Sequence, residues 1–179
     1  METITEKSFD HILETEHING CDLQRLVVER LKENSLKLAT AESCTGGLIS
    51  KKITEISGSS EVFDFGVCSY ANFIKHKILG VSEETLEKYG AVSARCAVEM
   101  AKGAALTANA DIGVSTTGIA GPTGGSAEKP VGLVYIGLYT KDCCCAFKTL
   151  LNENGRNNRQ KVRELASQIA LYKVLRTEL

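Results

Sequence analysis

Strand-like and helix-like patterns alternate along the first two thirds of this chain. Residues 36–40 are predicted to form a short strand, and residues 45–56 follow with apolar side chains at helical spacing. Residues 62–70, rich in Val, Phe and Tyr, repeat the strand pattern, and an alanine-rich helical pattern at 94–108 begins after Ser93. Such alternation is typical of proteins in which helices cover a largely parallel sheet. The pattern therefore predicts an α/β layer structure.

The last third of the chain instead contains two strand patterns in succession. Residues 131–139 and 143–150 are separated by the short segment 140–142, which predicts a hairpin and a mixed rather than wholly parallel sheet. The second strand opens with three cysteines at 143–145, which we expect to be small, buried apolar side chains. The remaining predictions are helices at 22–33, 71–79 and 157–178, a helix starting at Ser82, a strand at 111–116 and a glycine-rich loop at 118–130.

A chain of 179 residues favours a single domain, which at this size buries roughly 70% of its unfolded surface. We assign residues 21–179 to that domain and interpret residues 1–20, where periodicity is weak, as an extension that is mobile or loosely docked. The net charge of −1 gives no field that would attract nucleic acid or an anionic membrane. No membrane-length apolar run and no signal peptide are evident, so we expect a cytoplasmic protein. The seven irregularly spaced cysteines predict free thiols, and we expect no metal and no cofactor.

The segment Ala-Glu-Ser-Cys-Thr-Gly-Gly at 41–47 lies between a predicted strand and a predicted helix. This position places Ser43 on a turn, where a hydroxyl can stand beside free main-chain N–H groups, as a nucleophile with an oxyanion pocket requires. A serine at this place also suits a helix N-cap, and the segment taken alone favours the cap. Cys44 is a rival nucleophile, although His76 is the one histidine near a motif and gives it thin support.

The segment Tyr-Ala-Asn-Phe-Ile-Lys at 70–75 supplies groups that can activate Ser43. Lys75 in a partly desolvated pocket can lose its proton near neutral pH and act as a base. The Tyr70 hydroxyl can relay a proton or orient the base. Isolated lysines and tyrosines are more often solvated or packed, so this interpretation requires both side chains to point at Ser43.

Two further segments can hold an anionic substrate. The glycine-rich stretch at 118–126 lets main-chain N–H groups approach a phosphate or carboxylate, although a flexible turn is an equal alternative and no Walker motif closes it. Lys129, which follows, is either an anion contact or plain surface. Arg159 and Arg163 share a helix face, where they either clamp a phosphate or pair with acids such as Glu164.

Taken together, these motifs resemble those of the CinA C-terminal domain family, whose stand-alone members include the nicotinamide mononucleotide deamidases. The resemblance extends from about residue 22 to residue 175, nearly the whole chain. The matching motifs are Thr-Ala-Glu-Ser-Cys-Thr-Gly-Gly at 40–47, Gly-Ser-Ser at 58–60, Tyr-x-Asn-x-x-Lys at 70–75, Gly-Ala-Val-Ser at 90–93, Gly-Ile-Ala-Gly-Pro at 118–122 and Glu-Lys-Pro-Val-Gly at 128–132.

The resemblance implies a three-layer α/β/α sandwich around a mixed sheet. It also implies an amidohydrolase of pyridine-nucleotide salvage, which converts nicotinamide mononucleotide to nicotinic acid mononucleotide and ammonia, with Ser43 as nucleophile, Lys75 as base and Tyr70 assisting. The implied partner is a small nucleotide, with no nucleic acid and no membrane, and a homo-oligomer is compatible with the family. The alternative is a non-catalytic nucleotide-binding or protein-interaction module of the same family. The residues we expect to contact the substrate are Thr45, Gly46, Gly47, Asn72, Gly118, Ile119, Ala120, Gly121, Lys129 and Arg159.

Two features depart from the family pattern. Asn157-Asn158 precedes Arg159, where the family often has Gly-Asp, and this puts any role of that aspartate in doubt. Residues 1–20 match no family segment. Longer members also carry a nucleotide-pyrophosphatase-type domain, which has no match here, so activity on ADP-ribose is not expected.

Overall fold

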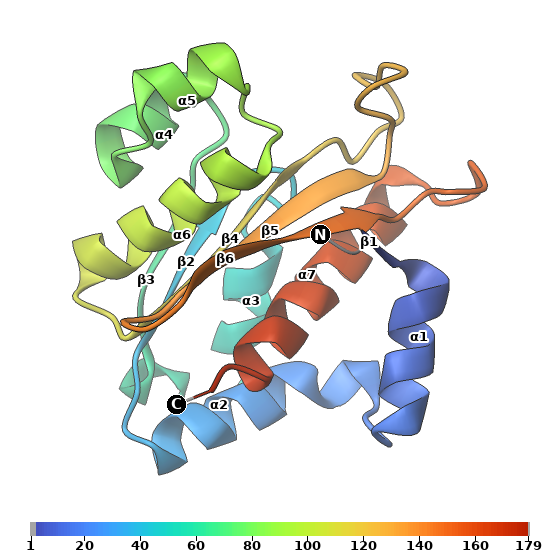
Figure 1. Ribbon diagram of the computed structural model, residues 1–179. Helices are drawn as coiled ribbons and strands as arrows, with labels where there is room; N and C mark the ends of the chain where they lie inside the picture. The colour runs from blue at the N-terminus through green and yellow to red at the C-terminus, as the bar shows by residue number, and fades with distance from the viewer. Residues whose placement is uncertain (1–2, 179) are drawn as a thin grey trace.

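Six strands and seven α-helices, counted over the described residues 3–178, form a three-layer α/β/α sandwich in this computed structural model (Figure 1). The strands are β1 (Thr3–Thr5), β2 (Leu38–Glu42), β3 (Phe63–Cys68), β4 (Ile112–Gly118), β5 (Leu133–Tyr139) and β6 (Cys144–Leu150). The helices are α1 (Glu6–Thr15), α2 (Leu23–Glu33), α3 (Leu48–Thr54), α4 (Asn72–Leu79), α5 (Glu83–Lys88), α6 (Ala94–Ala108) and α7 (Arg159–Leu175), with short 3₁₀ turns at Gly20–Asp22 and Ser59–Glu61.

The strands lie in the order β1-β6-β5-β4-β2-β3. Strand β5 is antiparallel to both of its neighbours, and every other pairing is parallel, so the sheet is mixed as predicted. The carboxyl ends of β2, β3 and β4 therefore meet at one edge of the sheet. In open α/β sheets, that edge is where ligands bind.

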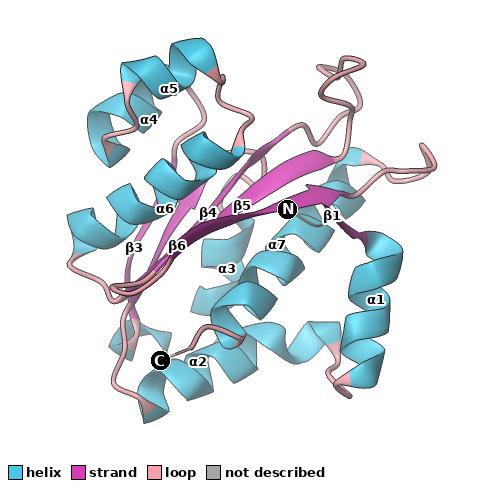
Figure 2. Ribbon diagram, viewed as in Figure 1, coloured by secondary structure: helices cyan, strands magenta, loops and turns pink. Residues whose placement is uncertain are grey.

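The two helical layers pack on opposite faces of the sheet (Figure 2). On one face, α2, α3 and α7 cover the larger apolar core, to which β2 contributes Leu38 and β4 contributes Val114. On the other face, α4, α5 and α6 cover a smaller core, to which β2 contributes Ala39 and Ala41. Successive β2 side chains alternate between the two faces of the sheet, and because helices cover both faces, all five β2 residues are buried.

Helix α6 lies unusually close to the sheet because glycines face it. A Cβ atom at Gly113 of β4 would lie 2.0 Å from the Ala101 carbonyl oxygen, and one at Gly137 of β5 would lie 2.1 Å from that of Ala97. Within the helical layer, Gly103 gives α4 the same close approach to α6. This contact holds α4, which carries Lys75, firmly beside the sheet edge.

Residues 3–15, for which the sequence predicts no strand or helix, form β1 and α1. Strand β1 pairs in parallel with the end of β6, from Thr3 opposite Lys148 to Thr5 opposite Leu150. Thr5 then caps α1, and Phe9 is buried edge-on against the Tyr172 ring. Phe9, Ile12 and Leu13 stand at helical spacing and face the core, a signal that the prediction of a mobile or loosely docked extension missed.

The predicted hairpin of β5 and β6 is confirmed, but the prediction that its cysteines are buried is wrong. Cys143 and Cys144 are exposed, and Cys145 is half-buried. Strand β1 pairs with the far end of β6, and no other strand among residues 3–178 pairs with the edge of β6 at the hairpin. No helix in residues 3–178 is both long and apolar enough to cross a membrane.

Candidate active site

Ser43 lies directly after β2, at the sheet edge where β2, β3 and β4 end. Its main-chain N–H donates to the Thr116 carbonyl at 2.9 Å, which fixes the serine against β4. The following glycines, Gly46 with φ +62° and Gly47 with φ +91°, turn the chain into α3 through conformations that favour glycine. The Ser43 residue is 9% exposed, so its hydroxyl lies in a sheltered position.

The alternative that Ser43 caps the following helix is wrong. Helix α3 begins five residues later, at Leu48, and Gly47 occupies its N-cap position without a side-chain bond. The buried carboxylate of Glu42 satisfies that helix end instead, by accepting the N–H groups of Ile49 at 3.0 Å and Ser50 at 2.8 Å. A carboxylate at a helix N-terminus is favourable, and because Glu42 fills this role the Ser43 hydroxyl does not cap α3.

The Lys75 amine lies within hydrogen-bond distance of the Ser43 hydroxyl. Its Nζ lies 3.1 Å from Ser43 Oγ and donates to the carbonyl oxygens of Ser69 at 2.6 Å and Tyr70 at 3.2 Å. The side chain is 1% exposed, although it stands on the otherwise largely exposed helix α4. The sequence-based requirement that Lys75 point at Ser43 is therefore met in the structure.

Burial lowers the pKa of the Lys75 amine below its ordinary value, because the charged form loses its hydration. Among the described residues, Lys75 takes part in no ion pair that would oppose this effect. Its three neighbours are all oxygens. When the amine is neutral, two N–H groups remain on the carbonyls and the lone pair points at the Ser43 hydroxyl, which is the geometry of a general base.

The Tyr70 side chain takes a different direction from the one the sequence suggests. The residue is 66% exposed, and the hydroxyl accepts a hydrogen bond from Arg159 Nη2 at 3.4 Å, whereas the Tyr70 carbonyl is the group that contacts Lys75. Arg159 Nη1 also donates to the Gly121 carbonyl at 2.9 Å. Tyr70, Arg159 and the glycine loop thus form one wall beside the Ser43–Lys75 pair.

The remaining residues that we predict to contact the substrate lie on several segments of the chain. Asn72 is exposed at the start of α4, and Gly46 and Gly47 lie beside Ser43. Gly118 is the last residue of β4. In the loop that continues to Gly121, Ile119 exchanges main-chain hydrogen bonds with Leu133 and Gly132, and Ala120 is buried. Lys129 Nζ donates to the Tyr89 carbonyl at 2.9 Å and so braces the turn before α6.

Arg163 has a role that sequence reasoning missed. Its Nε and Nη2 donate to the Thr45 carbonyl at 3.1 and 2.6 Å, while the Thr45 hydroxyl is buried against that of Thr116 at 2.6 Å. Thr45 is therefore a structural residue of the loop that follows Ser43, and Arg163 fixes that loop to α7. The helical spacing of Arg159 and Arg163 correctly places both on one face of α7, but it suggests a phosphate clamp rather than this contact with Thr45.

The main-chain N–H groups of Gly46 and Gly47 donate to no protein acceptor within the part of the chain that the structure describes, residues 3–178, and unlike Thr45 neither residue is buried. They lie on the turn that begins at Ser43. Free N–H groups on such a turn are suited to stabilise negative charge that develops on a substrate oxygen.

Cys44 is a poor nucleophile in this environment. The thiol is 5% exposed, and burial raises its pKa to about 12, so the thiolate is scarce at neutral pH. The side chain belongs to the apolar core under α2, α3 and α7.

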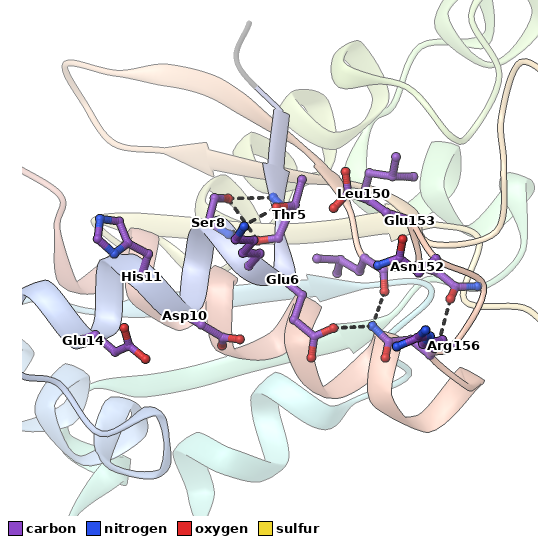
Figure 3. A pocket seen from close by; sticks show the side chains of 14 residues that line it. Thr5, Glu6, Ser8, Asp10, His11, Glu14, Leu150, Asn152, Glu153 and Arg156 are labelled. Carbon is purple, nitrogen blue, oxygen red and sulfur yellow. Dashed lines mark hydrogen bonds between the residues drawn. The ribbon is translucent and has the colours of Figure 1, made fainter.

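A cavity of about 840 Å³ lies at the other end of the same sheet edge, between α1 and the loop that joins β6 to α7 (Figure 3). Glu6, one of its charged groups, accepts from Asn157 at 2.7 Å and pairs with Lys161 at 3.1 Å. The cavity contains no nucleophile with a neighbouring base, and none of the predicted site residues lines it. We therefore place the chemistry at Ser43 and Lys75.

The departure from the family pattern before α7 has a structural explanation. Asn158 is the N-cap of α7 and accepts the N–H of Lys161 at 2.9 Å, a role that asparagine and aspartate fill equally well. Asn157 donates to the Leu151 carbonyl at 2.7 Å as well as to Glu6. No group of three or more His, Cys, Asp or Glu side chains in residues 3–178 is placed to hold a metal ion.

Comparison with known families identifies the fold and the site region together. The family model for the CinA C-terminal domain matches residues 21–178. A competence-damage inducible protein from Thermoanaerobacter sp. strain X514 is 54% identical over 142 residues, which cover 79% of this chain and 33% of that protein. A CinA-like protein from Kosmotoga olearia is 50% identical over 157 residues, covering 88% of this chain and 37% of that protein. The chain thus spans about a third of the length of these curated relatives.

Solved structures of similar length agree with this result. The crystal structure of a competence/damage inducible protein from Agrobacterium tumefaciens is 41% identical, with a TM-score of 0.81, and the match covers 86% of this chain and 92% of that one. A CinA superfamily protein from Escherichia coli is 32% identical, with a TM-score of 0.81, and the match covers 88% of this chain and 89% of that one.

Proposed function

The chain belongs to the CinA C-terminal domain family, and from this premise and the Ser43–Lys75 geometry we propose that it is an amidohydrolase. Its substrate is nicotinamide mononucleotide, and its products are nicotinic acid mononucleotide and ammonia. The observation that carries the proposal is the 3.1 Å contact between Ser43 Oγ and a buried lysine amine. Serine with a lysine base is a known arrangement for acyl transfer without histidine.

The reaction begins when Lys75 takes the Ser43 proton and Oγ attacks the carboxamide carbon. The carbonyl oxygen becomes negatively charged, and we assign the free N–H groups of Gly46 and Gly47 to stabilise it. The Lys75 ammonium then gives its proton to the amide nitrogen, the carbon–nitrogen bond breaks, and ammonia leaves. A water molecule, deprotonated by Lys75, hydrolyses the resulting ester and restores both side chains.

The wall formed by Tyr70, Arg159 and the loop at 118–121 is the region assigned to the nucleotide. Arg159 supplies a guanidinium, whose fork geometry suits a phosphate. Tyr70 supplies an exposed ring and a hydroxyl held by Arg159, and we assign it an assisting role on the substrate side. The reaction needs no metal and no cofactor, and its partner is this small nucleotide rather than nucleic acid or membrane. A homo-oligomer is compatible with the proposal.

The test is an ammonia-coupled assay with nicotinamide mononucleotide beside free nicotinamide and the intact dinucleotide. We expect release from the mononucleotide, and loss of at least about a hundredfold in rate for Ser43→Ala and Lys75→Ala variants with native circular dichroism. Equal release by wild type and Ser43→Ala would remove Ser43 from the mechanism. Saturable binding of the mononucleotide without turnover would favour the alternative, a non-catalytic nucleotide-binding or protein-interaction module.

A further inference from the structure

The end of the β5–β6 hairpin carries three consecutive cysteines that the proposed reaction does not use. Strand β6 begins at Cys144, opposite Tyr139 of β5, and its other end lies at the edge of the sheet shared with Ser43. The three thiols are therefore at the opposite edge of the sheet from the candidate active site. All three are free thiols, and two of them are exposed.

Two of these thiols are in contact on one face of the hairpin. Cys143 Sγ lies 3.6 Å from Cys145 Sγ. Residues two apart on a strand point to the same face, and here that face packs against α7, since Cys145 joins the apolar core on that side. Cys144 points to the opposite face, where burial raises the pKa of its thiol and the charge of Lys102 of α6 partly offsets that effect.

The geometry points to Cys143 and Cys145 as a two-thiol site for a soft, three-coordinate acceptor of the trivalent arsenic class. Two As–O bonds of a monosubstituted arsenoxide break, two As–S bonds form, and the oxygen leaves with both thiol protons as water. The arsenic keeps its oxidation state, so the reaction needs no oxidant and no reductant.

The number of available ligands selects this class of acceptor. A structural zinc ion requires four ligands, and no group of three or more metal-ligating side chains is assembled within residues 3–178. Soft ions prefer thiol ligands, and a pyramidal acceptor can be held by two adjacent sulfurs with its third position open. Because the two thiols already touch, formation of the second bond is intramolecular and strongly favoured.

Burial also separates this site from ordinary reactive cysteines. It raises the pKa of the Cys145 thiol to about 12, so simple alkylating agents that need a thiolate attack it slowly. An arsenoxide instead removes the thiol protons as it binds. The other exposed cysteines, Cys21 and Cys68, contact no second thiol among the described residues, so each can form only one bond to arsenic.

The experiment uses phenylarsine oxide as the probe and intact-protein mass spectrometry as the measurement. The protein is treated with one equivalent of the probe, then with excess 2-mercaptoethanol, which displaces arsenic held by one thiol but not by two. We expect a single adduct on wild type that survives the monothiol and is removed by 2,3-dimercaptopropanol. Before that removal, and after the monothiol has been washed away, iodoacetamide in denaturant should label two fewer of the seven cysteines than in untreated protein.

Variants locate the bridge. Cys144→Ser is the matched control, because it removes the neighbouring thiol on the opposite face, and it should keep the monothiol-resistant adduct. Cys143→Ser and Cys145→Ser should lose it by at least tenfold, while all three variants keep the wild-type circular dichroism spectrum. Retention of the adduct in both Cys143→Ser and Cys145→Ser, or its loss in Cys144→Ser, would overturn the assignment. If Cys145→Ser fails to fold, the other two variants still test the assignment. A bridge between Cys143 and Cys145 is lost in Cys143→Ser and kept in Cys144→Ser.

Discussion

Arg163 of α7 donates two hydrogen bonds to the main-chain carbonyl of Thr45, two residues after Ser43. The charged Arg163 guanidinium thus binds a neutral main-chain oxygen in the loop before α3 instead of pointing to solvent. The contact fixes the turn whose free N–H groups we assign to the oxyanion. Arg163 is therefore a positioning residue, which acts through the loop and does not need to touch the substrate.

Replacing Arg163 by methionine should loosen this turn while keeping the apolar part of the side chain. Loss of a hydrogen bond to a charged group is worth about 1.5–3 kcal/mol, so we expect kcat for ammonia release to fall about tenfold or more, with KM changed less. Initial rates as a function of substrate concentration measure both. Arg163→Lys, which keeps one donor, should recover part of the rate.

Arg176→Met is the control for this change. Arg176 is also on the α7 side of the molecule, but its guanidinium pairs with Glu16 at the end of α1. The control should keep the wild-type kcat even if its melting temperature falls. Equal rate losses in the two variants would show that Arg163 acts through general stability alone.

The dependence of the rate on pH should reflect the deprotonation of Lys75. Burial lowers the pKa of this amine, and the neutral form is the base, so kcat/KM should be low at acid pH and rise as pH passes through the lowered pKa. The inflection should lie below the ordinary lysine value of about 10.4. A pH–rate profile from about pH 5 to pH 10 measures it. A profile without a rising limb would contradict the role of Lys75.

Lys75→Arg gives a sharper version of the same test. A guanidinium cannot be deprotonated in proteins, so this variant keeps the positive charge and loses the base. We expect activity near that of Lys75→Ala at every pH. Recovery of activity in Lys75→Arg would indicate that the charge, not proton transfer, is what the site requires.

The Ser43–Lys75 pair shows how much of the candidate site can be predicted from sequence. The alternation of patterns predicts the layers, and the strand-then-turn position predicts Ser43 at the sheet edge. Whether Lys75 faces Ser43 or water is not visible in the sequence, because α4 is short and most of its residues are exposed. Its 1% exposure results from the way α4 packs against α6, a contact between segments far apart in the chain.

Other parts of the site depend on contacts that local patterns do not encode. Arg163 and Thr45 are separated by 118 positions, and the Tyr70 hydroxyl meets Arg159 across 89. In the sequence, Glu42 lies between a predicted strand and a predicted helix, and only the fold shows that its carboxylate accepts the N–H groups at the start of α3. The sequence thus identifies the groups that do chemistry more readily than those that hold them in place.

The close approach of α6 to the sheet predicts that Gly137→Ala is destabilising. The added Cβ would lie 2.1 Å from the Ala97 carbonyl oxygen and 2.6 Å from Ser115 Oγ, and neither the helix backbone nor the buried hydroxyl can move freely. Overpacking of this kind costs about 1–3 kcal/mol. We expect a lower midpoint in urea with an unchanged slope, since the unfolded chain is the same.

Gly20→Ala provides the matched control for this substitution. A Cβ there would meet the flexible side chains of Gln168 and Leu13 at 3.3 and 3.4 Å, and these can adjust. Its urea midpoint should remain near that of wild type. If Gly137→Ala were as stable as Gly20→Ala, the spacing between α6 and β5 would have to be larger than the structure shows.

Removal of residues 1–19 should lower stability without removing activity. The deletion takes away β1 and α1, including buried Phe9 and the Glu16 partner of Arg176 and Tyr172, while the Ser43–Lys75 pair lies at the opposite side of the sheet. The loss of one buried aromatic alone is worth about 2–3 kcal/mol, which corresponds to roughly 4–12 °C in melting temperature for a chain of this size. Scanning calorimetry and the ammonia assay at 20 °C measure the two effects separately. Because the family model begins at residue 21, we expect kcat/KM within about twofold of wild type, and a much larger loss in a deletion variant that is still folded would mean that α1 contributes to the site.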